Sequence, residues 1–262
     1  MRMPELPDVE GFRRYLRRHA EGRRIERVRA DPDIVRNTSP RGLGRALTGG
    51  RVGAPRRHGK WLACPVGDST LLLHFGMTGS LVWSGEEPER HRHDRMTLSL
   101  EGGELRYRDM RKLGGVWLAR PGQELEEVTG PLGPDALGLD RADLVKLLSG
   151  KRGGVKAALM DQRTVAGLGN LLVDEILWRA EVHPSRSIPD LGEDDLARIA
   201  EATEEVLRVS IERGGVPPDG SWLMGRRDRR DATCPRCGSD LERAKVAGRT
   251  SVFCPECQDA RR

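Results

Sequence analysis

The sequence predicts an α+β protein in which an N-terminal helix packs on a β-rich segment, followed by a helical domain and a C-terminal metal-binding hairpin. Apolar residues follow the helical period near the start of the chain and again beyond residue 140. Short apolar runs broken by glycines fill residues 23–120, and four of the five cysteines lie between residues 234 and 257. A chain of 262 residues is long enough for two or three such domains.

The first helix is predicted over "PDVEGFRRYLRRHAEGR", where Pro7 suits an opening turn and Val9, Phe12 and Leu16 share one face. The runs that follow, such as "STLLLHF", "SLVWS" and "ELRYRDM", are typical of a β-sandwich or a barrel. Cys64 stands alone in one of these runs and is interpreted as a core residue.

A segment rich in proline and glycine, "RPGQELEEVTGPLGPDALG", separates the β-rich part from the helical part and is interpreted as a linker. Helical periods return in "DRADLVKLLSG", "NLLVDEILWRAE" and "GEDDLARIAEATEEVLRVSIERGG". The predicted organisation is an N-terminal domain over residues 1–121, a linker over 122–139, a helical domain over 140–224 and a metal-binding segment over 225–262.

The net charge of +5 favours a polyanionic partner such as nucleic acid. No apolar run approaches the roughly 20 residues that span a bilayer, and the first residues lack the apolar stretch of a signal peptide. We therefore expect a cytoplasmic protein with no membrane partner. In that compartment five cysteines favour metal binding over disulfides.

The strongest local signal is the spacing C-x2-C-x16-C-x2-C, formed by Cys234, Cys237, Cys254 and Cys257. Two such cysteine pairs, brought together by a hairpin, give tetrahedral thiolate coordination of zinc. Four thiolates leave no open coordination position. The sequence therefore predicts one structural Zn²⁺ that supplies folding energy to this short segment.

The turn "GLGN" is a second signal. Gly167 and Gly169 permit unusual backbone conformations, and Asn170 then opens a helix. Such a helix start can bind a DNA phosphate, although the motif taken alone favours an ordinary capped helix after a turn.

The opening "MRMPELPDVE" raises a question of chemistry at Pro4. An amide nitrogen inside a chain is not nucleophilic, because its lone pair is delocalised into the carbonyl. If synthesis starts at Met3 and that residue is removed, Pro4 presents a secondary amine with a pKa of about 8, partly unprotonated at neutral pH. We expect the functional protein to start at Pro4; a start at Met1 remains the alternative.

These motifs occur in one order: "PELPDVE", "RRHGKW", "HFGMTGSL", "RYRDMRK", "GLGN" and the four-cysteine segment. Together they resemble the formamidopyrimidine-DNA glycosylase and endonuclease VIII family over almost the whole chain, and "PELP" is closer to the formamidopyrimidine branch. The resemblance implies a β-sandwich, a helix–two-turns–helix domain and a zinc-finger β-hairpin. It also implies a monomer that binds damaged duplex DNA between its two large domains.

The family resemblance implies a bifunctional enzyme that removes oxidised bases and cleaves the abasic site by β- and δ-elimination. Pro4 matches the nucleophile that forms an iminium with the sugar, and Glu5 matches the adjacent acid. Lys60 matches a lysine that donates a proton and touches a phosphate, and Arg249 matches the finger arginine of the last elimination step. The alternative is a non-catalytic, damage-shaped DNA-binding protein, which would follow if the Pro4 nitrogen stays in a peptide bond.

Further residues match DNA contacts of the family. Those expected at phosphates are His93, Arg111, Lys151 and Asn170, with Lys156 as a weaker candidate. Met77, Arg111 and Leu113 match the residues that fill the gap left by an everted nucleotide, and leucine stands here where the family has phenylalanine. Without the family, Met77 and Leu113 would be interpreted as core residues.

The connection between Gly215 and Arg226 is short, whereas the formamidopyrimidine branch has a long loop there that closes over 8-oxoguanine. We therefore expect ring-opened purines, oxidised pyrimidines and further-oxidised guanine products to be better substrates than 8-oxoguanine.

Overall fold

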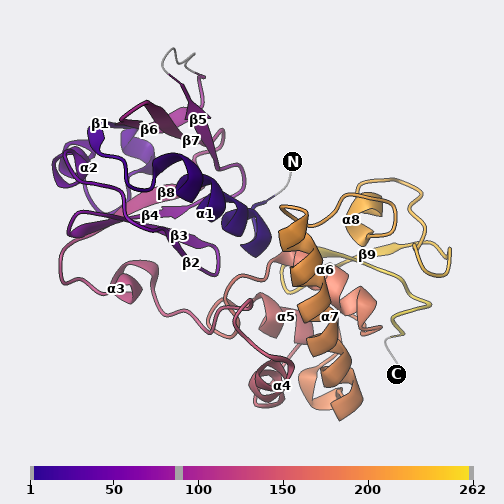
Figure 1. The fold of residues 1–262 in the computed structure, drawn as a ribbon. Coiled ribbons are helices and arrows are strands. Elements are labelled where there is room, and N and C mark those ends of the chain that lie inside the picture. Colours follow the sequence, from indigo (N-terminus) through magenta and orange to yellow (C-terminus); the bar gives the residue numbers. More distant parts are fainter. Residues whose placement is uncertain (1–2, 86–90, 260–262) are drawn as a thin grey trace. The chain divides into compact units, whose positions relative to one another are not determined.

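The computed structural model describes residues 3–85 and 91–259 (Figure 1). The chain divides into two compact units, one ending at Pro131 and the other beginning at Leu132. The predicted linker, 122–139, spans this boundary. Within the described ranges, no helix combines the length and the apolar character needed to cross a bilayer.

The N-terminal unit is a sandwich of two antiparallel four-stranded sheets, in the orders β1-β6-β7-β5 and β2-β3-β4-β8. Inward-facing residues alternate along the strands, as Met96, Leu98 and Leu100 do in β6, and form one core between the sheets. The strands are β1 (Ile25–Ala30), β2 (Arg56–His58), β3 (Trp61–Val66), β4 (Ser69–His74), β5 (Ser80–Ser84), β6 (Asp94–Leu100), β7 (Gly103–Arg108) and β8 (Gly115–Ala119). The predicted α+β fold class is confirmed. Of the two β architectures that the apolar runs allowed, a sandwich or a barrel, the structure has the sandwich.

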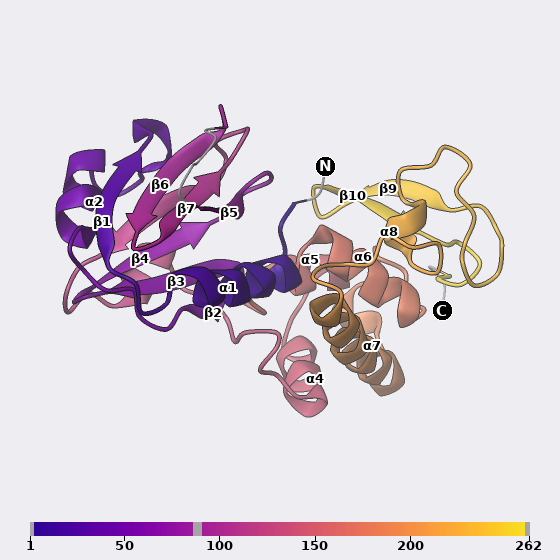
Figure 2. The same ribbon diagram turned by 45° about the horizontal axis from the view of Figure 1, so that its top comes forward.

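Helix α1 (Leu6–Ala20) contacts both sheets at their β5 and β2 edges and adds Val9 and Leu16 to the core (Figure 2). Helix α2 (Pro40–Leu47) was not predicted, although Ser39 Oγ accepts from Gly42 N at 3.0 Å in an ordinary N-cap. The short 3₁₀ helix η1 (Pro32–Ile34) and helix α3 (Leu125–Thr129) complete this unit. Cys64 is buried in the core, as expected.

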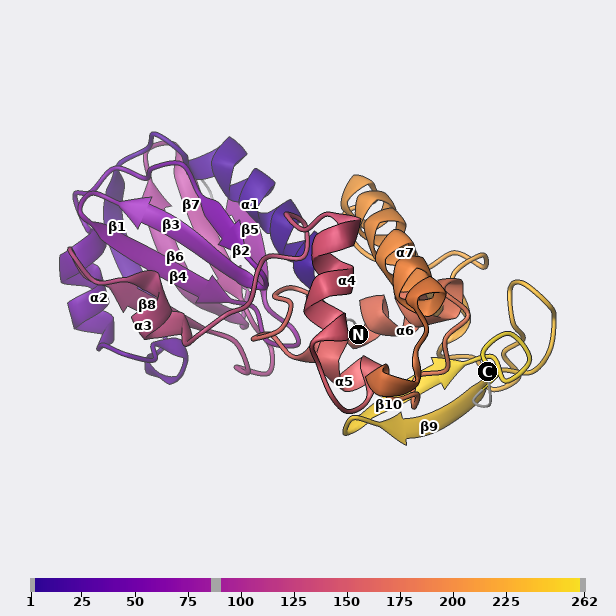
Figure 3. The same ribbon diagram turned by 90° about the horizontal axis from the view of Figure 1, so that it is seen from below.

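The second unit is helical and ends in a two-stranded hairpin (Figure 3). Helices α5 and α6 and the turns between them form the helix–two-turns–helix motif, and the long helix α7 packs on α6 and α4. The elements are α4 (Arg141–Ser149), α5 (Val155–Met160), α6 (Asn170–Arg179), η2 (Ile188–Asp190), α7 (Glu193–Glu212), α8 (Leu223–Arg226), β9 (Glu242–Val246) and β10 (Arg249–Phe253).

Candidate active site

Pro4 and Glu5 lie at the N-terminus of α1, and both are buried. Glu5 is the N-cap residue, and its backbone amide donates to Asp8 Oδ2 at 2.9 Å. The positive end of the helix dipole favours a carboxylate at this position. Helix α1 therefore fixes the backbone that follows the candidate nucleophile. Met1 and Arg2, on which the choice of start depends, lie outside the described residues.

Lys60 lies at the tip of the β2–β3 hairpin, beside Gly59, whose φ of 55° suits a tight two-residue turn. The hairpin is tied to α1 through Arg57, which donates to the Gly59 carbonyl at 3.0 Å and to Glu10 Oε2 at 3.4 Å. Burial alone would raise the pKa of Glu10, but hydrogen bonds and ion pairs led by Arg13 lower it. An ionised Glu10 thus links the helix that begins after Pro4 to the hairpin that carries Lys60.

His74 lies near Lys60 at the end of β4. Burial, and then the positive charge of Lys60, lower the pKa of His74 to about 4. Its Nδ1 accepts from Gly76 N at 3.3 Å, and its ring contacts Trp61 with 5.1 Å between centroids. The imidazole is therefore neutral at pH 7 and carries its proton on Nε2.

Two loops of the N-terminal unit are joined by the fully buried Asp109. Its Oδ1 accepts from the Thr78 hydroxyl and from Arg111 N at 3.1 Å, and its Oδ2 accepts from Gly114 N at 3.0 Å. A Cβ on Gly114 would lie 2.0 Å from Tyr107 Oη, so only glycine allows this approach. The hydrogen bonds of Asp109 consequently hold loops 75–79 and 109–114 together, and we refer to the two loops as one feature.

The side chains that this feature presents are apolar and exposed. Met77 is 38% exposed, Met110 45% and Leu113 50%. Arg111 Nη1 lies 3.4 Å from Met77 Sδ. The interpretation of Met77 and Leu113 as core residues is therefore wrong. We call Met77, Met110, Arg111 and Leu113 the wedge.

His93 is half-buried and adjoins the wedge, because its carbonyl accepts from Asp109 N at 2.9 Å. Arg92 Nε lies 3.1 Å from His93 Nε2, and Arg95 Nη2 lies 3.3 Å from Nδ1. Desolvation, followed by the charge of Arg92, lowers the pKa of His93. The structure thus brings His93, Met77, Arg111 and Leu113 into one region of the N-terminal unit.

In the second unit, Asn170 is the first residue of α6, as the sequence predicts. Gln162 fixes the preceding turn: its amide donates to the Leu168 carbonyl at 2.9 Å and accepts from Gly167 N at 3.0 Å. Asn170 Nδ2 donates to the Thr250 carbonyl at 3.0 Å, and its buried Oδ1 has no hydrogen-bond partner among the described residues. The turn is therefore connected to the hairpin strand β10.

The two lysines of this unit differ. Lys151 is half-exposed after α4, near enough to contribute to the lowered pKa of Asp161, whose main cause is the Thr164 hydroxyl. Lys156 is fully buried, and its Nζ lies 2.5 Å from Asp174 Oδ1. The prediction of a phosphate contact at Lys156 is not supported, since this amine is already paired and inaccessible.

Arg249 is exposed at the tip of the β9–β10 hairpin, where it pairs with Val246. The two residues of the turn, Ala247 and Gly248, have φ values of 51° and 71°, as a type I′ turn requires. The hairpin therefore projects the arginine side chain from a tight turn.

The four cysteines fit a zinc ion. Their sulfur atoms all lie within 4.8 Å of one another, and Cys234–Cys257 and Cys237–Cys254 are 3.9 Å and 3.5 Å apart. A tetrahedron with Zn–S bonds of about 2.3 Å has edges of about 3.8 Å. Trp178 Nε1 points at Cys234 Sγ from 3.4 Å, which favours a thiolate. The segment binds one structural Zn²⁺.

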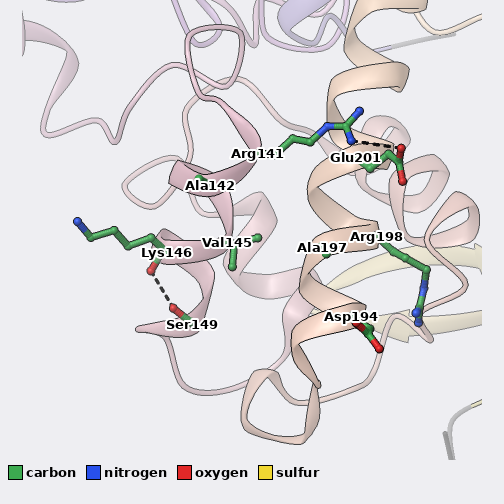
Figure 4. Close-up of a pocket in the computed structure, with 9 residues that line it drawn as sticks. All are labelled: Arg141, Ala142, Val145, Lys146, Ser149, Asp194, Ala197, Arg198 and Glu201. Carbon is green, nitrogen blue, oxygen red and sulfur yellow. Dashed lines mark hydrogen bonds and ion pairs between the residues drawn. The ribbon is translucent and has the colours of Figure 1, made fainter.

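A groove of about 740 Å³ lies between α4 and α7 (Figure 4). Most of its lining residues are charged or polar, and the Arg141–Glu201 ion pair at 3.2 Å joins the two helices across it. None of the predicted site residues lines it. It contributes nothing to the candidate site.

Sequence reasoning missed the residues that hold the predicted ones in place. Asp109 lies in "RYRDMRK", Thr78 in "HFGMTGSL", Arg57 in "RRHGKW" and Asp174 in "NLLVDEILWRAE", but the sequence alone gives none of them a role. The signal available for Asp109 was an acidic residue two positions before the expected Arg111. Nothing in the sequence shows that Glu10 and Arg57, 47 residues apart, form a pair.

Three family models match the chain. Residues 3–116 match the formamidopyrimidine-DNA glycosylase N-terminal domain and residues 132–218 its H2TH domain. Residues 233–260 match a zinc finger found in FPG and IleRS. Together the matches follow the order of the two units and the hairpin.

Known proteins are similar over their whole length. The formamidopyrimidine-DNA glycosylase of Rhodococcus jostii is 36% identical over 288 residues, which cover 99% of this chain and 97% of the relative. That of Methylococcus capsulatus is 36% identical over 272 residues, covering 98% and 100%. The structure of Lactococcus lactis Fpg with abasic-site DNA has a TM-score of 0.87 and 32% identity, covering 98% of this chain and 100% of that one. By its sequence, its domains and its fold, the chain belongs to the formamidopyrimidine-DNA glycosylase family.

Proposed function

We propose that this chain removes oxidised bases from duplex DNA and cleaves the resulting abasic site, with Pro4 as nucleophile. As a family member it is a base-excision DNA glycosylase, and lyase activity is typical of the family. The observation that carries the residue assignment is the chain of contacts from α1 through Glu10 and Arg57 to the Lys60 hairpin. It supports a common site for Pro4, Glu5 and Lys60.

The secondary amine of Pro4 would attack the anomeric carbon of the damaged nucleotide. A C–N bond to Pro4 forms as the glycosidic bond breaks, and the departing base takes a proton from an acid. The ring bond between the anomeric carbon and O4′ then breaks, O4′ takes up a proton, and the Pro4 nitrogen, which has lost its own proton, forms an iminium with the anomeric carbon. The iminium accepts electron density, so that loss of a proton from the sugar expels the 3′ phosphate by β-elimination. A second loss of a proton expels the 5′ phosphate by δ-elimination.

Three side chains assist these steps. Glu5, adjacent to the nucleophile, is the proposed proton donor to the sugar ring oxygen or to the departing base. Lys60 is the proposed donor to the sugar and phosphate near the lesion, beside the neutral His74. Arg249 is the proposed residue of the last elimination step, and its exposed position at a hairpin tip supports that role.

DNA would be held by phosphate contacts from both units: His93 and Arg111 from the first, Lys151 and Asn170 from the second. Lys156 is left out, because it is buried and paired. The wedge would replace the everted nucleotide in the base stack, since its exposed apolar side chains are anchored by Asp109. We further propose that the protein acts as a monomer at the nucleoid in a bacterial cytoplasm.

The substrate preference follows from the connection after α7. Trp222 and Leu223 are buried, Leu223 N donates to Glu175 Oε2 at 2.9 Å, and Arg179 lies 4.3 Å above the Trp222 ring. This part of the connection is packed on α6, which supports the view that it does not close over a flipped base. Solved structures of relatives include Fpg with an oxidised pyrimidine, a mutant Lactococcus lactis Fpg with Fapy-dG and MutM with carbocyclic 8-oxo-G, at TM-scores of 0.88, 0.87 and 0.86, so the preference rests on the connection and not on these relatives.

Single-turnover excision from matched duplexes tests the proposal. Ring-opened guanine and oxidised pyrimidines should be released faster than 8-oxoguanine opposite cytosine. If 8-oxoguanine is the fastest substrate, the preference is wrong and recognition of the base lies elsewhere. If no lesion is released and abasic DNA is not cleaved, the catalytic assignment itself fails.

A further inference from the structure

The buried carboxylate of Asp174 lies where α6 meets the zinc-finger hairpin, and it is only 2% exposed. Its Oδ1 accepts from Lys156 Nζ at 2.5 Å. Its Oδ2 accepts from the Arg227 guanidinium and from Val252 N at 3.2 Å. One carboxylate thus binds two cations and a backbone amide that come from α5, from the segment after α8 and from β10.

Both cations also bind strand β10. Lys156 Nζ donates to the hydroxyl of the buried Ser251 at 2.5 Å, and Arg227 Nη2 donates to the Thr250 carbonyl at 2.6 Å. The residues so held are consecutive and begin one position after Arg249. The anchored residues therefore adjoin the exposed arginine at the hairpin tip.

The strength of this arrangement depends on the negative charge. Lys156 is fully buried, and Arg227 and Asp174 are mostly so, with side-chain exposures of 14% and 2%. A buried pair whose partner is removed leaves an uncompensated charge, which must move or recruit water. Either response displaces the lysine and arginine donors, so that the Ser251 hydroxyl loses its lysine donor and the Thr250 carbonyl keeps only the hydrogen bond from Asn170 Nδ2.

We propose that Asp174 is a positioning residue for Arg249, which fixes the hairpin tip for the last elimination step. This inference rests on the proposed function of Arg249. Asp174 itself touches neither DNA nor the reacting atoms. Its loss should act on the step that needs the arginine and should spare base release, which uses groups of the other unit.

The test uses the full-length, zinc-loaded protein carrying Asp174→Asn. Glu204→Gln is the matched control, because Glu204 is an exposed carboxylate of the same unit that pairs with Arg141. On duplex DNA with a preformed abasic site, the ratio of δ- to β-elimination products should fall at least tenfold in Asp174→Asn. Base excision should stay within threefold, zinc content should stay at one per chain, and the control should match the unmodified protein.

A double-mutant comparison separates positioning from general destabilisation. Arg249→Ala should lower the δ/β ratio as Asp174→Asn does, and the double variant should be no worse than Arg249→Ala alone. Additive losses, or an equal fall in base excision and elimination, would overturn the proposal. If Asp174→Asn loses zinc, the same assay is made with the milder Ser251→Ala variant. An unchanged ratio of δ- to β-elimination products in that variant would also overturn the proposal.

Amide hydrogen exchange gives a readout that needs no catalysis. Residues 250–252 should exchange at least tenfold faster in Asp174→Asn than in the unmodified protein, while α6 stays protected. This result supports the anchoring even if the unmodified protein does not cleave abasic DNA, a failure that would count against the proposed function. Unchanged exchange in the hairpin would contradict the inference about Asp174.

Discussion

Replacing Asp109 with asparagine should release the wedge, because this carboxylate accepts hydrogen bonds at both oxygens. The new amide can keep an oxygen toward Thr78 and Arg111 N, but its NH₂ group then faces Gly114 N, which is also a donor. The variant therefore loses one charge-assisted hydrogen bond and buries donors without acceptors. No change of side-chain volume complicates the comparison.

The expected cost is about 3 kcal/mol of unfolding free energy. A hydrogen bond to a charged group contributes about 1.5–3 kcal/mol, and an unsatisfied buried donor costs about 1–3 kcal/mol. Part of this cost is relieved if residues 109–114 move. That movement displaces Arg111 and Leu113 and should weaken binding to abasic-site DNA by about tenfold, or about 1.4 kcal/mol.

Urea unfolding followed by circular dichroism measures the stability of Asp109→Asn, and fluorescence anisotropy with an abasic-site duplex measures binding. Asp68→Asn is the control, because Asp68 is exposed in the β3–β4 turn of the same unit. Its unfolding free energy and affinity should be unchanged. If Asp109→Asn is as stable as the control and binds as tightly, the role given to Asp109 is refuted.

Three further predictions concern zinc, the wedge and pH. Chelation of zinc should expose Trp178, shift its fluorescence to the red and weaken DNA binding. Full affinity after verified zinc loss would show that the zinc finger does not contribute to DNA binding. Leu113→Phe should sharpen discrimination among the four bases opposite a lesion, since a phenyl ring stacks better than leucine; an unchanged pattern in single-turnover excision would contradict this. Because the pKa of His74 is lowered to about 4 in the folded protein, His74 of the unfolded chain takes up a proton at a higher pH than His74 of the folded protein. Unfolding free energy should therefore drop between pH 6.5 and 4 by up to about 3 kcal/mol, and His74→Gln should remove that part of the slope in urea titrations.

The β-rich segment, the helical segment that follows it and the zinc site could be predicted because their signals are local or repeated, whereas the choice of a sandwich over a barrel came from the family resemblance. The alternation of apolar residues in β6 identifies a strand by itself, and four cysteines in two pairs identify a metal site. The unpredicted helix α2 shows a weaker signal: Ser39 and Pro40 mark a helix start, but the glycines that follow are poor helix formers. Its stability comes from Leu43 and Leu47 in the core.

The positions of long charged side chains could not be predicted, because their partners are distant in the sequence. Lys156 meets Asp174 from 18 residues away and Ser251 from 95, so its burial depends on the completed fold. Asp109 meets Thr78 across 31 residues. In both cases a charged residue that would be solvated on an isolated element is instead an internal anchor.

Reduction with borohydride during reaction with abasic-site DNA tests the central claim most directly, because it captures a covalent complex only if an amine has formed an imine or iminium with the sugar. The account predicts a stable protein–DNA adduct, and peptide mapping should place it on an N-terminal Pro4 in a chain whose intact mass lacks residues 1–3. A chain that retains Met1 and still cleaves abasic DNA, or an adduct mapped to a lysine such as Lys60, would contradict the proline mechanism. Absence of any adduct from a zinc-loaded protein that binds the DNA would favour a non-catalytic, damage-binding role.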